Sequence, residues 1–181
     1  TMDMKGHDDV EFRMELANDS LLTMERVSDV AKRKTAPNNY YFAGVNADFY
    51  ITWDPYKGNP NMACYMDGQI AMYDMDEPLR YGHFFMDYNK NMWCDFPFET
   101  FYMTKADGTK MELNHINHDL NDNQLVLYNE KGGHWTKTKD ATEIRVKLVE
   151  GEKWRINSPF KLQVIGSPVV GGNMQVMPGE A

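Results

Sequence analysis

Residues 61–73 read NMACYMDGQIAMY, two short apolar runs on either side of an Asp-Gly pair. Asp67 and Gly68 are a strong signal for a two-residue hairpin turn, because both residue types tolerate the positive φ angles that such a turn requires. Each apolar run has the length of a strand rather than of a helix. This stretch therefore predicts an antiparallel β-hairpin, and the rest of the chain follows the same pattern.

Other segments extend this pattern along the chain. A second Asp-Gly turn, Asp107-Gly108, lies within FETFYMTKADGTKMEL, residues 98–113. Further runs of strand length occupy residues 12–16, 40–51, 82–88, 123–129, 142–154 and 160–166. Residues 23–34 show the three- and four-residue apolar spacing of a helix, and Pro37 follows them. We predict an α+β fold, a strand-rich antiparallel or mixed sheet with hairpins and one main helix packed on it.

The composition limits the classes of function. The chain of 181 residues suits a single domain, which we expect to span residues 1–181. Its formal net charge of −8 repels phosphate backbones and argues against a nucleic-acid partner. No apolar run approaches the roughly 20 residues that cross a bilayer, so we expect no transmembrane segment. An apolar stretch follows the turn at Gly171-Gly172 and stops at Ala181, which favours a domain truncated at its C-terminus.

The predicted strand at residues 40–51 ends in a polar sequence, VNADFY, at residues 45–50. Asn46 and Asp48 are two positions apart, so in a strand their side chains point to the same face. A carboxylate there can act as a base or a nucleophile, and an amide can orient a hydroxyl. The pair is a candidate polar site; the alternative is a polar turn that ends a strand.

Several segments together resemble the phosphodiester glycosidase family, from about Val10 to the end of the chain. The family has a helix, an Asn-Gly-Gly/Asp-Phe-Phe-type turn, a Gly-x-Pro segment, an Asp-Gly hairpin, and then Leu-Val-Leu-Tyr, Thr-x-Thr and Gly-Thr-Glu-Val. The matching segments here are ERVSDVAKR (25–33), AGVNADFY (43–50), GNPNMACYMDGQIA (58–71) and NQLVLYNEKGGHWTKTKDATEIRV (123–146). Ala47, Tyr50 and Ala141 depart from the family's commoner residues, and its C-terminal Arg-containing strand and Gly-Arg turn are not present.

The resemblance implies a reaction in which a sugar's anomeric bond to a phosphodiester is cleaved. Carboxylates near the anomeric carbon stabilise an oxocarbenium-like transition state. We assign this role to Asp48 and Glu143, which we expect to approach each other in one shallow cleft. The substrate-binding candidates are Asn46, Tyr128, His134, Thr136 and Thr138. The competing interpretations are an exposed charge on a strand for Glu143, plain β propensity for the two threonines, and loop closure for His134.

The sequence gives little indication of a metal or a cofactor. His115 and His118 are three residues apart beside Asp119 and could form half a metal site, but no matching ligand pair lies nearby in the sequence. Surface loop histidines are the favoured interpretation, and we predict no metal. No Walker motif or Gly-x-Gly-x-x-Gly occurs, so we predict no cofactor. Cys64 and Cys94 could form a disulfide, although free thiols are favoured.

We therefore expect a hydrolase-like domain of the phosphodiester glycosidase type that acts on a carbohydrate or glycosyl-phosphate substrate. The alternative for this fragment on its own is an inactive domain. The resemblance implies a secreted, periplasmic or cell-surface location. The missing C-terminal part of the same domain is an expected partner. The alternative is a non-catalytic carbohydrate-binding or structural module of a secreted protein.

Overall fold

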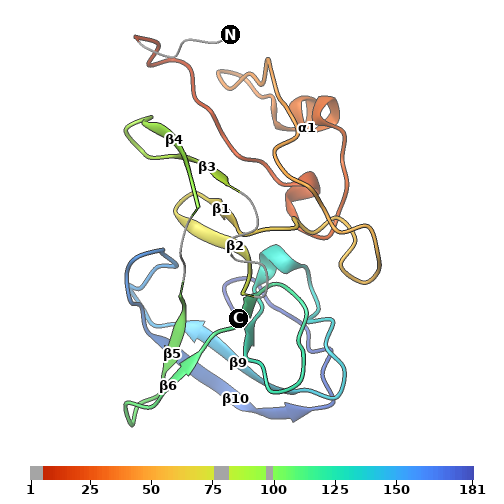
Figure 1. Ribbon diagram of the computed structural model, residues 1–181, viewed down its shortest axis with the longest axis vertical. Coiled ribbons are helices and arrows are strands. Elements are labelled where there is room, and N and C mark those ends of the chain that lie inside the picture. Colours follow the sequence, from red (N-terminus) through yellow and green to blue (C-terminus); the bar gives the residue numbers. More distant parts are fainter. Residues whose placement is uncertain (1–5, 76–81, 97–99) are drawn as a thin grey trace.

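A computed structural model describes residues 6–75, 82–96 and 100–181 (Figure 1). In these residues the predicted fold class is confirmed, because one α-helix accompanies ten strands in mostly antiparallel sheets. The elements are η1 (Ala17–Asp19), α1 (Val27–Lys34), β1 (Cys64–Met66), β2 (Gln69–Asp74), β3 (His83–Met86), β4 (Met92–Asp95), β5 (Tyr102–Thr104), β6 (Lys110–Glu112), β7 (His115–Ile116), β8 (Val126–Leu127), η2 (Glu130–Gly132), β9 (Thr142–Leu148) and β10 (Leu162–Val170). Among the described residues, no helix has the length and apolar character to span a membrane.

Both predicted Asp-Gly hairpins are confirmed. Strands β1 and β2 pair antiparallel around Asp67 and Gly68, which have φ angles of 52° and 71°. Strands β5 and β6 pair around the second turn, where Gly108 has a φ of 87° and the Asp107 carboxylate accepts the Thr109 N–H. Positions 98 and 99 of the second predicted segment lie outside the described residues.

The strands form one four-stranded sheet and three separate pairs. The larger sheet has the order β1-β2-β7-β8, with β2 and β7 antiparallel and β7 and β8 parallel. The pairs are β3 with β4, β5 with β6, and β9 with β10. The tail also joins β9, since Val146 and Ala181 exchange backbone hydrogen bonds of 2.6 and 2.9 Å.

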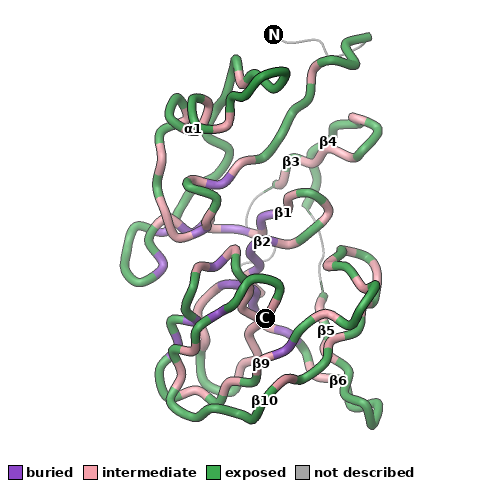
Figure 2. The backbone as a smooth tube through the Cα atoms, turned by 180° about the vertical axis from the view of Figure 1, so that it is seen from behind, coloured by how far each residue is buried: buried purple, intermediate pink, exposed green. Residues whose placement is uncertain are grey.

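The core lies along the four-stranded sheet (Figure 2). One cluster joins the segment before α1 to β1 and β2 and consists of Leu16, Leu21, Cys64, Ala71 and Met72. A second cluster on β2 and β7 contains Tyr73, Leu113 and Ile116, and the Tyr73 ring packs edge-on against Phe101 at 4.7 Å. Alternation along β2 sends Met72 and Tyr73 into different clusters, so this strand is buried on both faces.

Two predicted strands are wrong. Residues 12–16 are not in a strand, although Leu16 is buried and the Met14 sulfur lies 3.3 Å from the Cys64 thiol. Residues 42–50 are exposed and form no regular strand; Tyr50 makes an isolated bridge to Pro60. The apolar residues that suggested a buried strand lie at the surface, including Phe42 and Val45 with exposed fractions of 70% and 77%. A strand needs a partner edge, and the described structure gives this segment only that single bridge.

The helix begins at Val27, four residues after the predicted start, and ends at Lys34 as predicted. Arg33 joins it to the segment before it, with contacts to Asp19 at 2.7 Å and Glu25 at 2.8 Å. Lys34 contacts Asp19 at 2.5 Å. Both cations lie in the last turn, where positive charge also favours the helix C-terminus.

Candidate functional site

Part of the site predicted from the sequence is assembled beside β9. The segment after η2 runs next to residues 173–176, because Thr136 donates its N–H to the Met174 carbonyl at 3.0 Å and Val176 donates to His134. Local alternation turns Thr136 and Thr138 inward, with exposed fractions of 7% and 6%. Glu143 comes from the start of β9 and is half-buried. We call Thr136, Thr138 and Glu143 the glutamate cluster.

Both oxygens of Glu143 are held in place. The Thr138 hydroxyl donates to Oε1 at 2.5 Å, and the backbone N–H of Met174 donates to Oε2 at 2.9 Å. The hydroxyls of Thr136 and Thr138 lie 3.2 Å apart. Such bonds fix the direction of the carboxylate. The competing interpretation of Glu143 as an exposed charge on a strand does not match this environment, because the side chain is half-buried and both its oxygens accept hydrogen bonds.

Tyr128 lies next to this cluster. Its hydroxyl donates to the His118 carbonyl at 2.6 Å. Burial raises the pKa of the Tyr128 phenol far above its ordinary value, and the neighbouring Tyr56, Asp119 and Glu143 act in the same direction. The phenol therefore stays protonated at physiological pH and remains a hydrogen-bond donor. Its electrostatic contacts link the glutamate cluster to a second group of polar residues.

That second group is the histidine cluster, which we define as Asp74, His115 and His118. His115 Nδ1 lies 3.1 Å from Asp74 Oδ1, and His118 Nε2 lies 3.7 Å from Asp74 Oδ2. The side chains are 10%, 1% and 13% exposed in chain order. The expectation of surface loop histidines is therefore wrong. The sequence did not reveal the third member, because Asp74 lies 41 residues before His115. Asp74 and His115 come into contact only when β2 pairs with β7.

Asp48 and Asn46 have different surroundings from Glu143. Both residues are exposed in the irregular segment 42–50, so the strand that was expected to present them side by side does not exist. Partial burial of its carboxyl group raises the pKa of Asp48, while the Phe49 N–H and the nearby His83 oppose that shift. This segment runs between α1 and β1 in Figure 1, whereas β9 lies in the lower half. The structure therefore does not bring Asp48 and Asn46 to Glu143.

His134 lies at the rim of the glutamate cluster. It is exposed, as is the adjacent Trp135, which makes an isolated bridge to Gln175. The carbonyl of His134 accepts the Val176 N–H, so its backbone is fixed while its ring faces solvent. An exposed ring pair beside two buried hydroxyls is compatible with stacking on a sugar and also with the closure of a loop.

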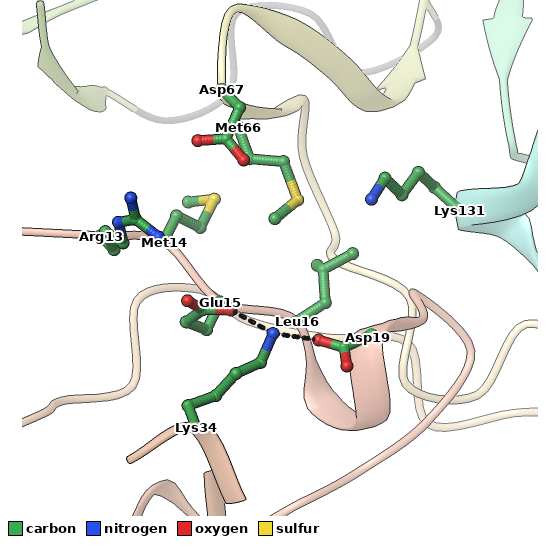
Figure 3. A pocket seen from close by; sticks show the side chains of 9 residues that line it. All are labelled: Arg13, Met14, Glu15, Leu16, Asp19, Lys34, Met66, Asp67 and Lys131. Carbon is green, nitrogen blue, oxygen red and sulfur yellow. Dashed lines mark ion pairs between the residues drawn. The ribbon is translucent and has the colours of Figure 1, made fainter. Parts of the chain in front are cut away.

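A separate cavity of about 260 Å³ lies between the N-terminal segment and the β1–β2 turn (Figure 3). Lys34 points into it between Glu15 and Asp19, with nitrogen-to-oxygen distances of 3.0 and 2.5 Å. Lys131 reaches it from the opposite side. Its described lining residues include none of the predicted site residues. The lining carries three basic side chains, Arg13, Lys34 and Lys131, and three acidic ones, Glu15, Asp19 and Asp67, so the cavity has no strong preference for one sign of charge.

The two cysteines are free thiols, as the sequence favoured. Cys64 is buried in the core, and this burial raises the pKa of its thiol to about 12. Cys94 is exposed in β4. Because the thiolate is the reactive form, Cys64 is chemically inert at neutral pH and acts as a small core residue.

Comparison of the chain with protein-family models, curated proteins and solved structures found no match.

Proposed function

We propose that this chain is a glycoside hydrolase-like domain that cleaves the sugar-to-phosphate bond of glycosyl phosphodiesters at the glutamate cluster. The observation that carries the proposal is the fixed carboxylate of Glu143, which accepts from Thr138 and from the Met174 N–H. The segments that contribute Tyr128, the threonines and Glu143 are also those that resemble the phosphodiester glycosidase family. The same resemblance is the basis for proposing a secreted, periplasmic or cell-surface location.

The proposed chemistry assigns one role to each group. The Glu143 carboxylate, held by its two hydrogen bonds, stabilises positive charge at the anomeric carbon in an oxocarbenium-like transition state. The phosphate leaves with the bonding electron pair, and a water molecule adds to that carbon and gives up a proton. The Tyr128 phenol, which stays protonated, has one hydrogen, so it donates to an oxygen of the departing phosphate only after releasing the His118 carbonyl. A phosphate ester is a good leaving group, so a strong general acid is not needed. Asp48 has no part in this scheme, because it lies in another region of the fold.

The alternative is a non-catalytic carbohydrate-binding or structural module, and one observation favours it. Both Glu143 oxygens already accept hydrogen bonds from the protein, which is the state of a carboxylate that holds two segments together. In such a module the sugar would contact exposed rings, and Trp135 is 46% exposed next to the cluster. The two functions therefore depend on different side chains.

Release of reducing sugar from a panel of synthetic sugar 1-phosphodiesters distinguishes them. In an enzyme, Glu143→Gln should lower the rate by roughly 10²-fold or more. The matched control, Glu150→Gln, changes an exposed carboxylate just after the same strand and should leave the rate unchanged. Circular dichroism checks that both variants fold.

Turnover that survives Glu143→Gln would overturn the assignment of the active site. Absence of turnover of every sugar in the panel, by the unaltered chain and by a chain extended past Ala181, would overturn the enzymatic proposal. Calorimetry with the same panel then decides the alternative: a binding module retains affinity in Glu143→Gln and loses it in Trp135→Ala.

A further inference from the structure

We propose that the histidine cluster binds a divalent transition metal ion, with zinc as the ion that best suits its ligands. Two imidazoles and a carboxylate are a common ligand set for catalytic zinc sites, which leave a fourth position for water or substrate. The inference stands apart from the proposed function, because it uses no residue of the glutamate cluster.

The distances between the ligand atoms fit one shared ion. Ligands about 2.0–2.2 Å from zinc in a tetrahedral arrangement lie roughly 3.3–3.6 Å from one another. The two observed nitrogen-to-oxygen distances, 3.1 and 3.7 Å, bracket that range. One ligand atom from each of the three residues lies within 4.8 Å of the other two. The two short distances go to different oxygens of Asp74, so the set would have to contract from the 4.8 Å limit to close around an ion.

Two separate devices of the backbone position the ligands. Strand pairing places Asp74 directly opposite His115 in the β2–β7 ladder. Asn117 then adopts a φ of 51°, which turns the chain after β7 so that His118 returns towards the same carboxylate. The Asn117 side chain is anchored in turn by a 2.8 Å bond to the Ala71 carbonyl on β2. The three ligands are therefore held on a rigid part of the fold.

A hydrogen bond selects the ring nitrogen of His115 that faces the proposed ion. Gln124 Oε1 accepts the Asn121 N–H at 3.0 Å, which identifies that side-chain atom as the amide oxygen. The same oxygen lies 2.9 Å from His115 Nε2, so Nε2 must carry a proton and donate it. In the neutral ring Nδ1 then presents its lone pair towards Asp74, as a metal ligand does. Outer contacts of this kind commonly orient histidine ligands in metal sites.

The surroundings add negative charge and fix the second ring. Asp119 lies close enough to both histidines and to Asp74 to interact with them electrostatically, so a second carboxylate borders the cluster. The Tyr56 ring stacks on His118 at 5.9 Å with an interplanar angle of 18°. A cation in this place would offset the mutual repulsion of two carboxylates in a largely buried setting.

The competing explanation for the short distance between His115 Nδ1 and Asp74 Oδ1 is a proton on Nδ1 instead of a shared metal ion. A second proton on the His115 ring would let Nδ1 donate to Asp74, and the cluster would then be a buried ion pair that binds no metal. The two explanations differ in a direct measurement, because Co²⁺ replaces zinc in such sites and gives visible absorption bands that depend on its ligands.

The test is a titration of the metal-free full chain with Co²⁺, followed by competition with Zn²⁺. We expect one Co²⁺ per chain, visible bands that zinc abolishes, and a higher melting temperature with zinc, because an ion bound only by the folded state stabilises it. His118→Asn should abolish the bands. The matched control His134→Asn changes an exposed histidine and should leave them intact.

A variant outside the ligand set guards against misfolding of His118→Asn. Gln124→Ala removes the acceptor for His115 Nε2 and should weaken metal affinity by about 10–100-fold without removing a ligand. Failure of the unaltered chain to bind Co²⁺ stoichiometrically would overturn the proposal in favour of the protonated ion pair. Equal binding by His118→Asn and the unaltered chain would overturn it as well, since the ion would then lie elsewhere.

Discussion

Asn117 and the asparagine of the segment 42–50, Asn46, both lie among apolar residues in the sequence. In the structure Asn117 is buried, whereas Asn46 is exposed. Asn117 is 1% exposed and joins three parts of the chain, whereas residues 42–50 are exposed throughout. The Asn117 amide donates to Ala71 and Asn129, and its own oxygen accepts the Asn129 N–H. The difference shows that partners elsewhere in the fold, more than local composition, decide which residues are buried.

The largest expected effect comes from removing the Asn117 side chain. Asn117→Ala leaves the Ala71 carbonyl and the Asn129 N–H buried without their partner, and should lower the free energy of unfolding by about 2–4 kcal/mol. Urea denaturation measures the loss. Asn123→Ala, at an exposed position with a similar φ of 61°, is the control and should cost less than about 1 kcal/mol. Equal losses in the two variants would show that the buried hydrogen bonds of Asn117 contribute no more than an exposed asparagine does.

A methyl group at Gly132 should produce a smaller loss in the same place. A Cβ there would lie 2.5 Å from Asn117 Oδ1 and 2.8 Å from its Cγ, so the anchored amide would have to shift. Gly132→Ala should destabilise the chain by about 1–3 kcal/mol. At Gly82 the nearest atom to an added Cβ is 3.6 Å away, and Gly82→Ala should be nearly neutral. Thermal melts of Gly132→Ala and Gly82→Ala measure the two effects. An unchanged melting temperature in Gly132→Ala would show that the Asn117 side chain can shift without loss of stability.

The smallest effect is expected in the exposed region around α1. Arg33→Ala removes contacts with Asp19 and Glu25, and its effect on stability should be small, because water and salt screen ion pairs near the surface. The charges of Lys34 and Arg33 lower the pKa of Asp19, so its contribution is present at neutral pH and is lost as the pH falls through that lowered pKa. Urea denaturation at low and high salt measures the effect of Arg33→Ala. Urea denaturation at pH 7 and in acid measures the contribution of Asp19. A loss as large as that of Asn117→Ala would erase the contrast between the regions.

The parts of the fold that could be predicted are those with local causes. The two Asp-Gly turns specify hairpins because the turn residues and both strands are adjacent in the sequence. The end of α1 was also predictable from its basic last turn and from Pro37 beyond it. Its start was not, since Arg26 at the N-cap position makes no side-chain capping bond.

The segment 42–50 shows where local signals fail. Its aromatic and β-branched residues have high strand propensity, but propensity supplies no hydrogen-bonding edge. Tyr50 finds only an isolated bridge to Pro60, and the residues before it remain at the surface. The candidate pair Asn46 and Asp48 depended on that strand, so the prediction of their common face failed with it.

The candidate site was predictable only within one stretch of sequence. Glu143 and Thr138 are five residues apart, and their contact required little more than a turn. The histidine cluster needed the register of β2 against β7, which the sequence of either strand does not reveal. His115 and His118 were visible as a spaced pair, and the remaining signal was Asp74 at the end of a strand that is buried on both faces.

The bonds of Asn117 also bear on the order in which the chain folds. Its partners Ala71 and Asn59 are 46 and 58 residues away, so loops of that size must close before either bond exists. The two hairpins require only short loops and can form much earlier. The hydrogen bonds of Asn117 are therefore expected to form late, after the hairpins. Their loss should speed unfolding and leave the folding rate nearly unchanged.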